Sequence, residues 1–82
     1  MYLTIKKKSA TGKKIMVENI AEALAKFIYS KEMNMIRYED FNGCFIYNKE
    51  NQPLYKVDWD RNIFIWDGKN NNFTDDDIPV IL

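Results

Sequence analysis

Residues 19–32, with the sequence NIAEALAKFIYSKE, are the only stretch of this chain with the apolar spacing of an α-helix. Its larger apolar residues recur at intervals of three and four positions: Ile20, Leu24, Phe27 and Ile28. Asn19 is a favourable N-cap, and Glu22 lies three residues later, at the spacing of a capping box. Asn34 tolerates the left-handed conformation that ends helices. The stretch therefore predicts one amphipathic helix that covers one face of a sheet.

The residues before this helix alternate between apolar and polar side chains, as expected for strands with one solvated face. Residues 2–8 and 13–17 show the alternation, and Gly12 between them can supply a positive φ. We therefore expect an N-terminal β-hairpin. Five lysines flank its turn: Lys6, Lys7, Lys8, Lys13 and Lys14.

These five lysines permit two interpretations. Lysines on a solvated strand edge prevent the sheet from pairing with another chain, and we favour this interpretation. The alternative is a nucleic-acid-binding module in which the hairpin lysines contact phosphates. No aromatic residue is interleaved with the lysines in the sequence, and base stacking would need one.

After residue 35 the apolar pattern takes the period of β-strands. Four stretches indicate strands: residues 36–41, 44–47, 54–59 and 63–66. Asn42-Gly43 is a strong signal for a hairpin turn between the first two. The sequence therefore predicts an α+β fold. It consists of an N-terminal β-hairpin, one amphipathic helix, and a four-stranded antiparallel meander with the helix packed on one sheet face.

The register of the last hairpin decides which large apolar side chains face away from the helix. One face of its first strand carries three apolar residues: Tyr55, Val57 and Trp59. A two-residue turn would place Phe64 and Trp66 on that face. A three-residue turn with a bulge at Asn62 would place Ile63 and Ile65 there instead. In either register some large apolar side chains remain on the second face, where the tail, another chain or nothing covers them.

Residues 67–82 form a tail that is first acidic and then apolar. Four aspartates stand against one lysine in it, and it ends in the apolar sequence IPVIL. We expect this tail to dock on the second sheet face or to add an edge strand. The whole chain of 82 residues is short enough to be a single small domain.

The composition argues against several function classes. The chain has no histidine, and its single cysteine, Cys44, therefore has no histidine base. The formal net charge of zero argues against a uniformly polybasic protein. We predict no enzyme, no cofactor, no metal site, no small-molecule substrate and no membrane association. One cysteine in a chain this small favours the cytoplasm over secretion.

The surplus of aromatic and apolar side chains favours a small non-catalytic protein-binding or regulatory domain, with a homodimer as its simplest form. Small cytoplasmic proteins of this composition often come from phage or mobile elements, which we adopt as a hypothesis of origin. The predicted protein-binding residues are Tyr55, Trp59, Phe64, Trp66, Phe73, Val80 and Leu82. The alternative function is nucleic-acid binding through the five hairpin lysines.

Overall fold

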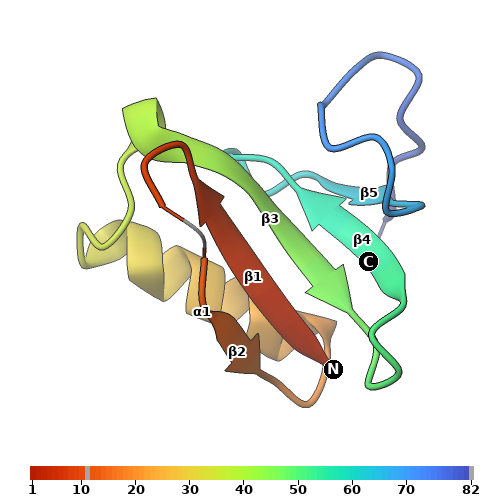
Figure 1. The fold of residues 1–82 in the computed structure, drawn as a ribbon, viewed down its shortest axis with the longest axis horizontal. Helices are drawn as coiled ribbons and strands as arrows, with labels where there is room; N and C mark the ends of the chain where they lie inside the picture. The colour runs from red at the N-terminus through yellow and green to blue at the C-terminus, as the bar shows by residue number, and fades with distance from the viewer. Residues whose placement is uncertain (11, 82) are drawn as a thin grey trace.

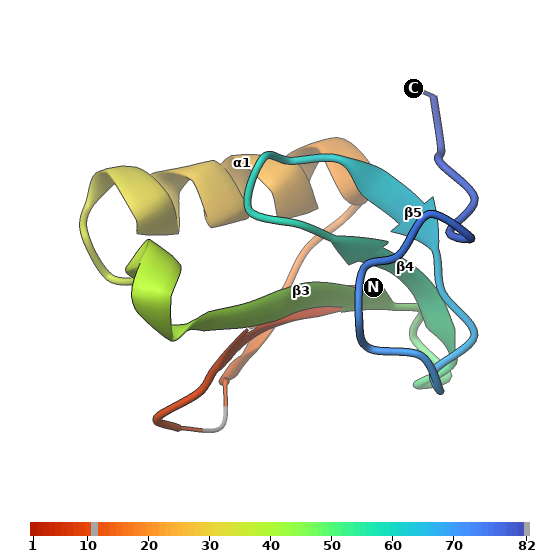
Figure 2. The same cartoon turned by 90° about the horizontal axis from the view of Figure 1, so that it is seen from above.

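The computed structural model describes residues 1–10 and 12–81, and it shows one helix packed on a five-stranded antiparallel sheet (Figures 1 and 2). The strands are β1 (Tyr2–Lys7), β2 (Lys14–Met16), β3 (Phe41–Tyr47), β4 (Pro53–Val57) and β5 (Ile63–Ile65). Helix α1 (Ile20–Glu32) follows β2, and the short 3-10 helix η1 (Tyr38–Asp40) precedes β3. The strand order is β2-β1-β3-β4-β5. The predicted α+β fold, with the helix on one sheet face, is confirmed.

Helix α1 begins and ends where the sequence predicts. The side-chain oxygen of Asn19 accepts the backbone N–H of Glu22 at 2.9 Å. The carboxylate of Glu22 reaches one residue further back than a capping box requires, and accepts the N–H of Glu18 at 3.1 Å. Asn34 has a φ of +55°, and this left-handed residue turns the chain away from the helix axis.

The core lies between α1 and the sheet. Phe27 of the helix is fully buried against the sheet, and its ring stacks on that of Phe41 with the centroids 5.5 Å apart. Burial of a large apolar side chain contributes about 1.5–3 kcal/mol, so this core is a main source of stability for the fold. The buried residues of this core are Leu3, Ile5, Val17, Ala23, Phe27, Ile36, Cys44, Ile46, Val57 and Ile63.

The predicted strand over residues 36–41 was wrong, so the meander has three strands instead of four. Ile36 is buried in the core, and the chain then forms η1 before it enters β3. The N–H of Asp40 donates to the carbonyl of Arg37 at 3.1 Å, which closes this helical turn. Ile36 thus packs in the core without strand pairing, and Phe41, the last residue of the predicted strand, is the first residue of β3.

The Asn42-Gly43 dipeptide is a bulge within β3, and the predicted hairpin turn was also wrong. Ile5 pairs with Cys44 and Lys7 pairs with Phe41, so two steps along β1 lie opposite three along β3. The extra residue is absorbed where Gly43 has a φ of +108°. A bulge and a hairpin turn both need a positive φ, so this dipeptide favours either structure.

The β4–β5 hairpin has the register of the bulged turn. Ile63 lies opposite Val57, and Ile65 lies opposite Tyr55, so both isoleucines share the face toward the helix. The residue with positive φ in the turn is Arg61 at +70°, one position before the predicted bulge at Asn62. Consequently Phe64 lies on the opposite sheet face.

Residues 67–81, which we name the C-terminal arm, return to the outer edge of β5. The N–H of Ile65 donates to the carbonyl of Ile78 at 3.0 Å, and the N–H of Val80 donates to the carbonyl of Ile63 at 2.8 Å. Pro79 forms an isolated bridge to β5 between these two bonds. The arm thus occupies the edge of β5, while β2 is the other edge strand of the sheet.

Candidate functional site

The aromatic and apolar residues predicted to bind a protein do not form one exposed surface. Tyr55, Trp59 and Val80 are half-buried and pack against the core on the helix side. Phe64 and Phe73 are half-buried on the opposite side, with their ring centroids 5.8 Å apart.

Trp66 is buried on the same side as Phe64, where it contacts the rings of Phe45 and Tyr47 at centroid distances of 4.5 Å and 5.3 Å. Leu82 lies outside the described residues. The six described residues of the predicted set are therefore divided between the two faces of the sheet.

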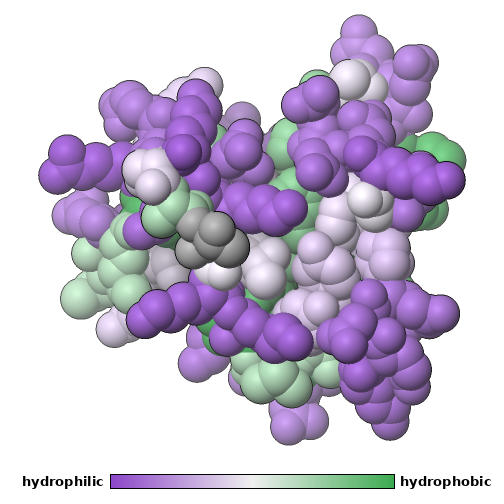
Figure 3. All heavy atoms as spheres, in the orientation of Figure 1, coloured by the Kyte–Doolittle hydropathy of each residue, from purple (hydrophilic) through white to green (hydrophobic). Residues whose placement is uncertain are grey.

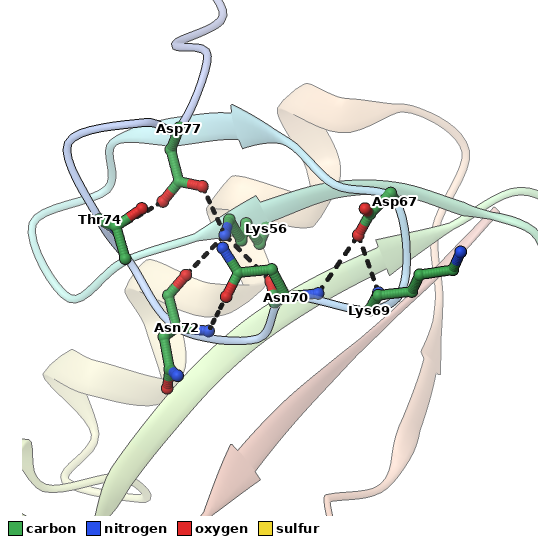
Figure 4. A network of polar contacts seen from close by, with 7 residues as sticks. All are labelled: Lys56, Asp67, Lys69, Asn70, Asn72, Thr74 and Asp77. Carbon is green, nitrogen blue, oxygen red and sulfur yellow. Dashed lines mark hydrogen bonds and ion pairs between the residues drawn. The ribbon is translucent and has the colours of Figure 1, made fainter.

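A buried lysine fixes the C-terminal arm over this second face (Figure 4). The Lys56 side chain is 1% exposed, and its ammonium group donates to the carbonyls of Asn70 at 3.0 Å and Asn72 at 2.6 Å. The same group lies 2.7 Å from a carboxylate oxygen of Asp77. These three contacts match the three N–H donors of the ammonium group.

Asp77 has further support within the arm. Its second carboxylate oxygen accepts the N–H of Thr74 at 2.8 Å. The bond from Lys56 and the bond from this N–H lower the pKa of Asp77 below its ordinary value. The carboxylate therefore stays charged at neutral pH, and it balances the buried ammonium group.

Two of the five hairpin lysines lie across aromatic rings on the sheet face opposite α1. The Lys6 ammonium group is 4.7 Å from the ring centroid of Phe45, and the Lys14 group is 4.3 Å from that of Tyr2. The rings of Tyr2 and Tyr47 stack beside them at 4.7 Å. In Figure 3, atoms of intermediate and apolar character occupy the middle of this face and are flanked by hydrophilic atoms.

Two of these three aromatic neighbours, Phe45 and Tyr47, come from β3, so the hairpin sequence alone does not reveal them. Phe45 is fully buried and Tyr2 is nearly so. The lysines thus cover ring faces on which bases would have to stack. Of the other hairpin lysines, Lys8 is exposed, while Lys7 and Lys13 line a groove described below.

Several exposed apolar residues belong to the end of α1 and the segment that follows it, and the predicted site residues did not include them. Eight large apolar side chains are exposed among the described residues, and four of them fall within residues 29–38. We name these four the helix-end surface: Tyr29, Met33, Met35 and Tyr38. The sequence signal for this surface is the Met33 and Met35 pair directly after the helix, since methionine is common at adaptable binding surfaces.

A groove of about 440 Å³ opens between the β1–β2 hairpin and the end of α1. Ile5 and Ile15 line it from the sheet, and Ser30, Met35 and Ile36 line it from the helix side. Lys7 and Lys13 add positive charge, and none of the described residues that line it is acidic. The groove is therefore apolar and basic.

The outer edge of β2 borders this groove. The N–H of Val17 donates to the carbonyl of Met1 at 3.0 Å, and Ile15 lies opposite Leu3. Because hydrogen-bonding direction alternates along an antiparallel pair, Lys14 and Met16 direct their backbone N–H and C=O groups away from β1. No strand of the described chain pairs with this side of β2.

The thiol of Cys44 is enclosed by the core, and burial raises its pKa to about 12. A thiol of this kind is a poor nucleophile at neutral pH. Within residues 1–10 and 12–81, no three histidine, cysteine or acidic side chains gather as metal ligands would. In the same residues, α1 is too short and too polar to cross a bilayer.

Comparisons with models of protein families, with curated proteins and with solved structures found no significant match.

Proposed function

We propose that this chain is a small non-catalytic protein-binding domain whose partner docks on the helix-end surface. The observation that carries the proposal is the concentration of four exposed large apolar side chains within ten residues. Single exposed apolar residues are normal, but a group of them favours an interface. Two of the four are methionines, whose flexible side chains adapt to the shape of a partner.

The proposed partner is a protein, and a second copy of this chain is its simplest form. A symmetric homodimer would bring two helix-end surfaces together, which buries the same methionines on both subunits. A cytoplasmic setting fits the single enclosed thiol, since secreted domains of this size usually carry disulfides.

Nucleic-acid binding has less support. Lys6 and Lys14 already lie over aromatic rings, and Phe45 and Tyr2 present little free ring surface for bases. A titration with a random oligonucleotide at low salt tests this alternative. Binding that falls steeply with added salt would favour the alternative over the protein-binding proposal.

The main test combines peptide selection with sedimentation. Peptides from a displayed random library are selected on the wild-type domain and then measured on Met33→Ser/Met35→Ser. Because the two methionines are exposed, the double variant should fold as the wild type does, and circular dichroism checks this. We expect the selected peptides to bind the variant at least about tenfold more weakly, a loss of about 1.4 kcal/mol.

The matched control is Ile78→Ser, which removes a similarly exposed apolar side chain from the C-terminal arm. This control should bind the selected peptides as the wild type does. The proposal is wrong if peptides bind both variants equally, or if no peptide is selected and sedimentation shows a monomer at every protein concentration.

A further inference from the structure

The open edge of β2 and the helix-end surface meet at the same groove. In Figure 1, the last turns of α1 extend beyond the outer edge of β2, behind the sheet. The lining of the groove agrees with this view, because Ile15 of β2 and Met35 after α1 both contribute to it. A chain placed alongside β2 would therefore lie over the end of the helix.

We propose that the partner supplies an extended acidic and apolar segment, which adds to the sheet as a strand beside β2. This inference rests on the proposed function, since it names the partner chemistry for the same region. Strand addition to an exposed sheet edge is a recurring mode of peptide recognition, in which main-chain hydrogen bonds supply affinity.

The backbone of β2 offers the hydrogen bonds that such a strand needs. Lys14 and Met16 each direct one N–H and one C=O outward, as the pairing with β1 requires. The opposite edge of the sheet differs, because the C-terminal arm already pairs with β5 there. Among the described strands, β2 is thus the edge that can accept another chain.

The groove determines the side chains of the added strand. Alternate residues of a strand point to one face, so every second residue beside β2 would point toward α1. There it would meet Ile15, Met35 and Ile36, which favour apolar side chains.

The lysines around the groove favour acidic side chains at the remaining positions of the added strand. Lys7 and Lys13 line the groove, and Lys14 lies on the other face of β2. No acidic residue occurs among the first 17 positions, and the acidic side chain that folds back onto the hairpin, Asp40, accepts hydrogen bonds from Ser9 and lies outside the lining of the groove. Asp40 also acts electrostatically on Lys7, so Lys13 and Lys14 carry most of the uncompensated charge. Acidic residues at the intervening and terminal positions of the segment would therefore complement the surface. The same lysines would still oppose pairing with a basic edge, such as β2 of a second copy, so the edge selects an acidic strand.

The C-terminal arm of a second copy has similar chemistry, but its own fold occupies it. Asp77 is paired with Lys56, and Pro79 bridges to β5. Displacing the arm would break these contacts, so we assign the groove to a different chain.

The probe is a synthetic peptide of about seven residues that alternates aspartate with isoleucine or valine, a length typical of a strand. Amide resonances and hydrogen exchange of the full chain are followed by NMR. We expect the peptide to shift the amides of Lys14 and Met16 and to slow their exchange, because both N–H groups gain an acceptor.

Two altered peptides separate pairing from charge. The first altered peptide carries N-methyl groups on every second residue. It is made in two versions, one with the odd-numbered and one with the even-numbered residues methylated, because only one of these two sets directs its backbone N–H groups toward β2. The second altered peptide replaces each aspartate with lysine. The lysine peptide, and the version whose N-methyl groups face β2, should each bind at least about tenfold more weakly than the original peptide, a loss of about 1.4 kcal/mol.

A charge-reversed domain supplies the complementary measurement. Lys7→Glu/Lys13→Glu should bind the acidic peptide more weakly and the lysine peptide more tightly than the wild type does. Misfolding could not produce the gain in affinity for the lysine peptide. The matched control, Lys49→Glu/Lys69→Glu, makes the same change of net charge at exposed positions away from the groove. It should leave the preference for the acidic peptide unchanged.

Several outcomes would overturn the inference. Equal binding of both N-methyl versions would exclude strand pairing. Amide shifts confined to residues 33–38 would leave the proposed function intact and remove the role of β2. The same conclusion would follow if the selected peptides bind the wild-type domain through Met33 and Met35 while the acidic peptide does not bind. Protection of Lys14 and Met16 that grows with protein concentration alone would assign the groove to a second copy.

Discussion

The ammonium group of Lys56 lies 2.7 Å from a carboxylate oxygen of Asp77, and the two side chains are only 1% and 7% exposed. Lys56 belongs to β4, whereas Asp77 lies near the end of the C-terminal arm. An ion pair shielded in this way contributes little net stability when complete, but losing one partner leaves a buried charge that is costly. The pair therefore ties the position of the arm to the integrity of the sheet.

Asp77→Ala should destabilise the domain by about 1–3 kcal/mol, because the buried side chain of Lys56 would lose its carboxylate partner. Chemical denaturation followed by tryptophan fluorescence measures the change. Asp76→Ala is the matched control, since Asp76 is exposed, and it should change the free energy of unfolding by no more than about 0.5 kcal/mol. Equal effects of the two substitutions would contradict the assigned role of Asp77.

Acid should weaken the attachment of the arm through the same carboxylate. The contacts from Lys56 and Thr74 lower the pKa of Asp77 in the folded state. A lowered folded-state pKa means that this contribution is complete above about pH 4 and is lost as the pH falls through the folded-state value. The free energy of unfolding should therefore fall less steeply with acid below about pH 4 in Asp77→Asn than in the wild type. Parallel pH profiles would contradict this prediction.

Gly43→Ala tests the bulge in β3. Its φ of +108° is strained for any other residue, and an added Cβ would lie 2.6 Å from an atom of the Phe45 ring. We expect a destabilisation of about 1–3 kcal/mol, measured by denaturation. Asn42→Ala alters the exposed neighbour and should have an effect within about 0.5 kcal/mol. A neutral Gly43→Ala would mean that β3 does not need the bulge.

The features of the fold that depend on local pattern were predictable. The spacing of Ile20, Leu24 and Phe27 specified the helix, and Asn19 and Asn34 marked its ends, because capping acts within a few residues. The hairpin turn predicted at Asn42-Gly43 was wrong because a residue with positive φ occurs in bulges as well as in turns. Only the pairing of β1 with β3 distinguishes the two, and pairing is not local.

The contacts that shape the two sheet faces were not predictable from local pattern. Lys56 alternates with apolar neighbours as a solvated residue would, yet it is buried because Asp77 lies 21 positions later and folds back over it. Lys6 meets Phe45 only because β3 lies beside β1. Likewise, the exposure of Met35 follows from the path of the chain after α1, which the sequence does not determine on its own.

Cys44 should react with thiol reagents only when the domain unfolds. Its side chain is 1% exposed, and burial raises the pKa of the thiol to about 12, so both access and thiolate are lacking at neutral pH. Release of coloured thiolate from a disulfide reagent should be slow in buffer and rapid in denaturant. Rapid reaction of the native protein would contradict the burial of this residue.

Removal of residues 73–82 tests how far the arm protects the sheet. The cut removes Phe73 from Phe64, Asp77 from Lys56, and the two backbone bonds at the edge of β5. A freed strand edge beside an uncovered apolar ring promotes pairing between chains. The truncated domain should therefore be less stable than the full chain and should sediment as larger species as its concentration rises. A truncated chain that stays monomeric and equally stable would show that the arm has no structural role.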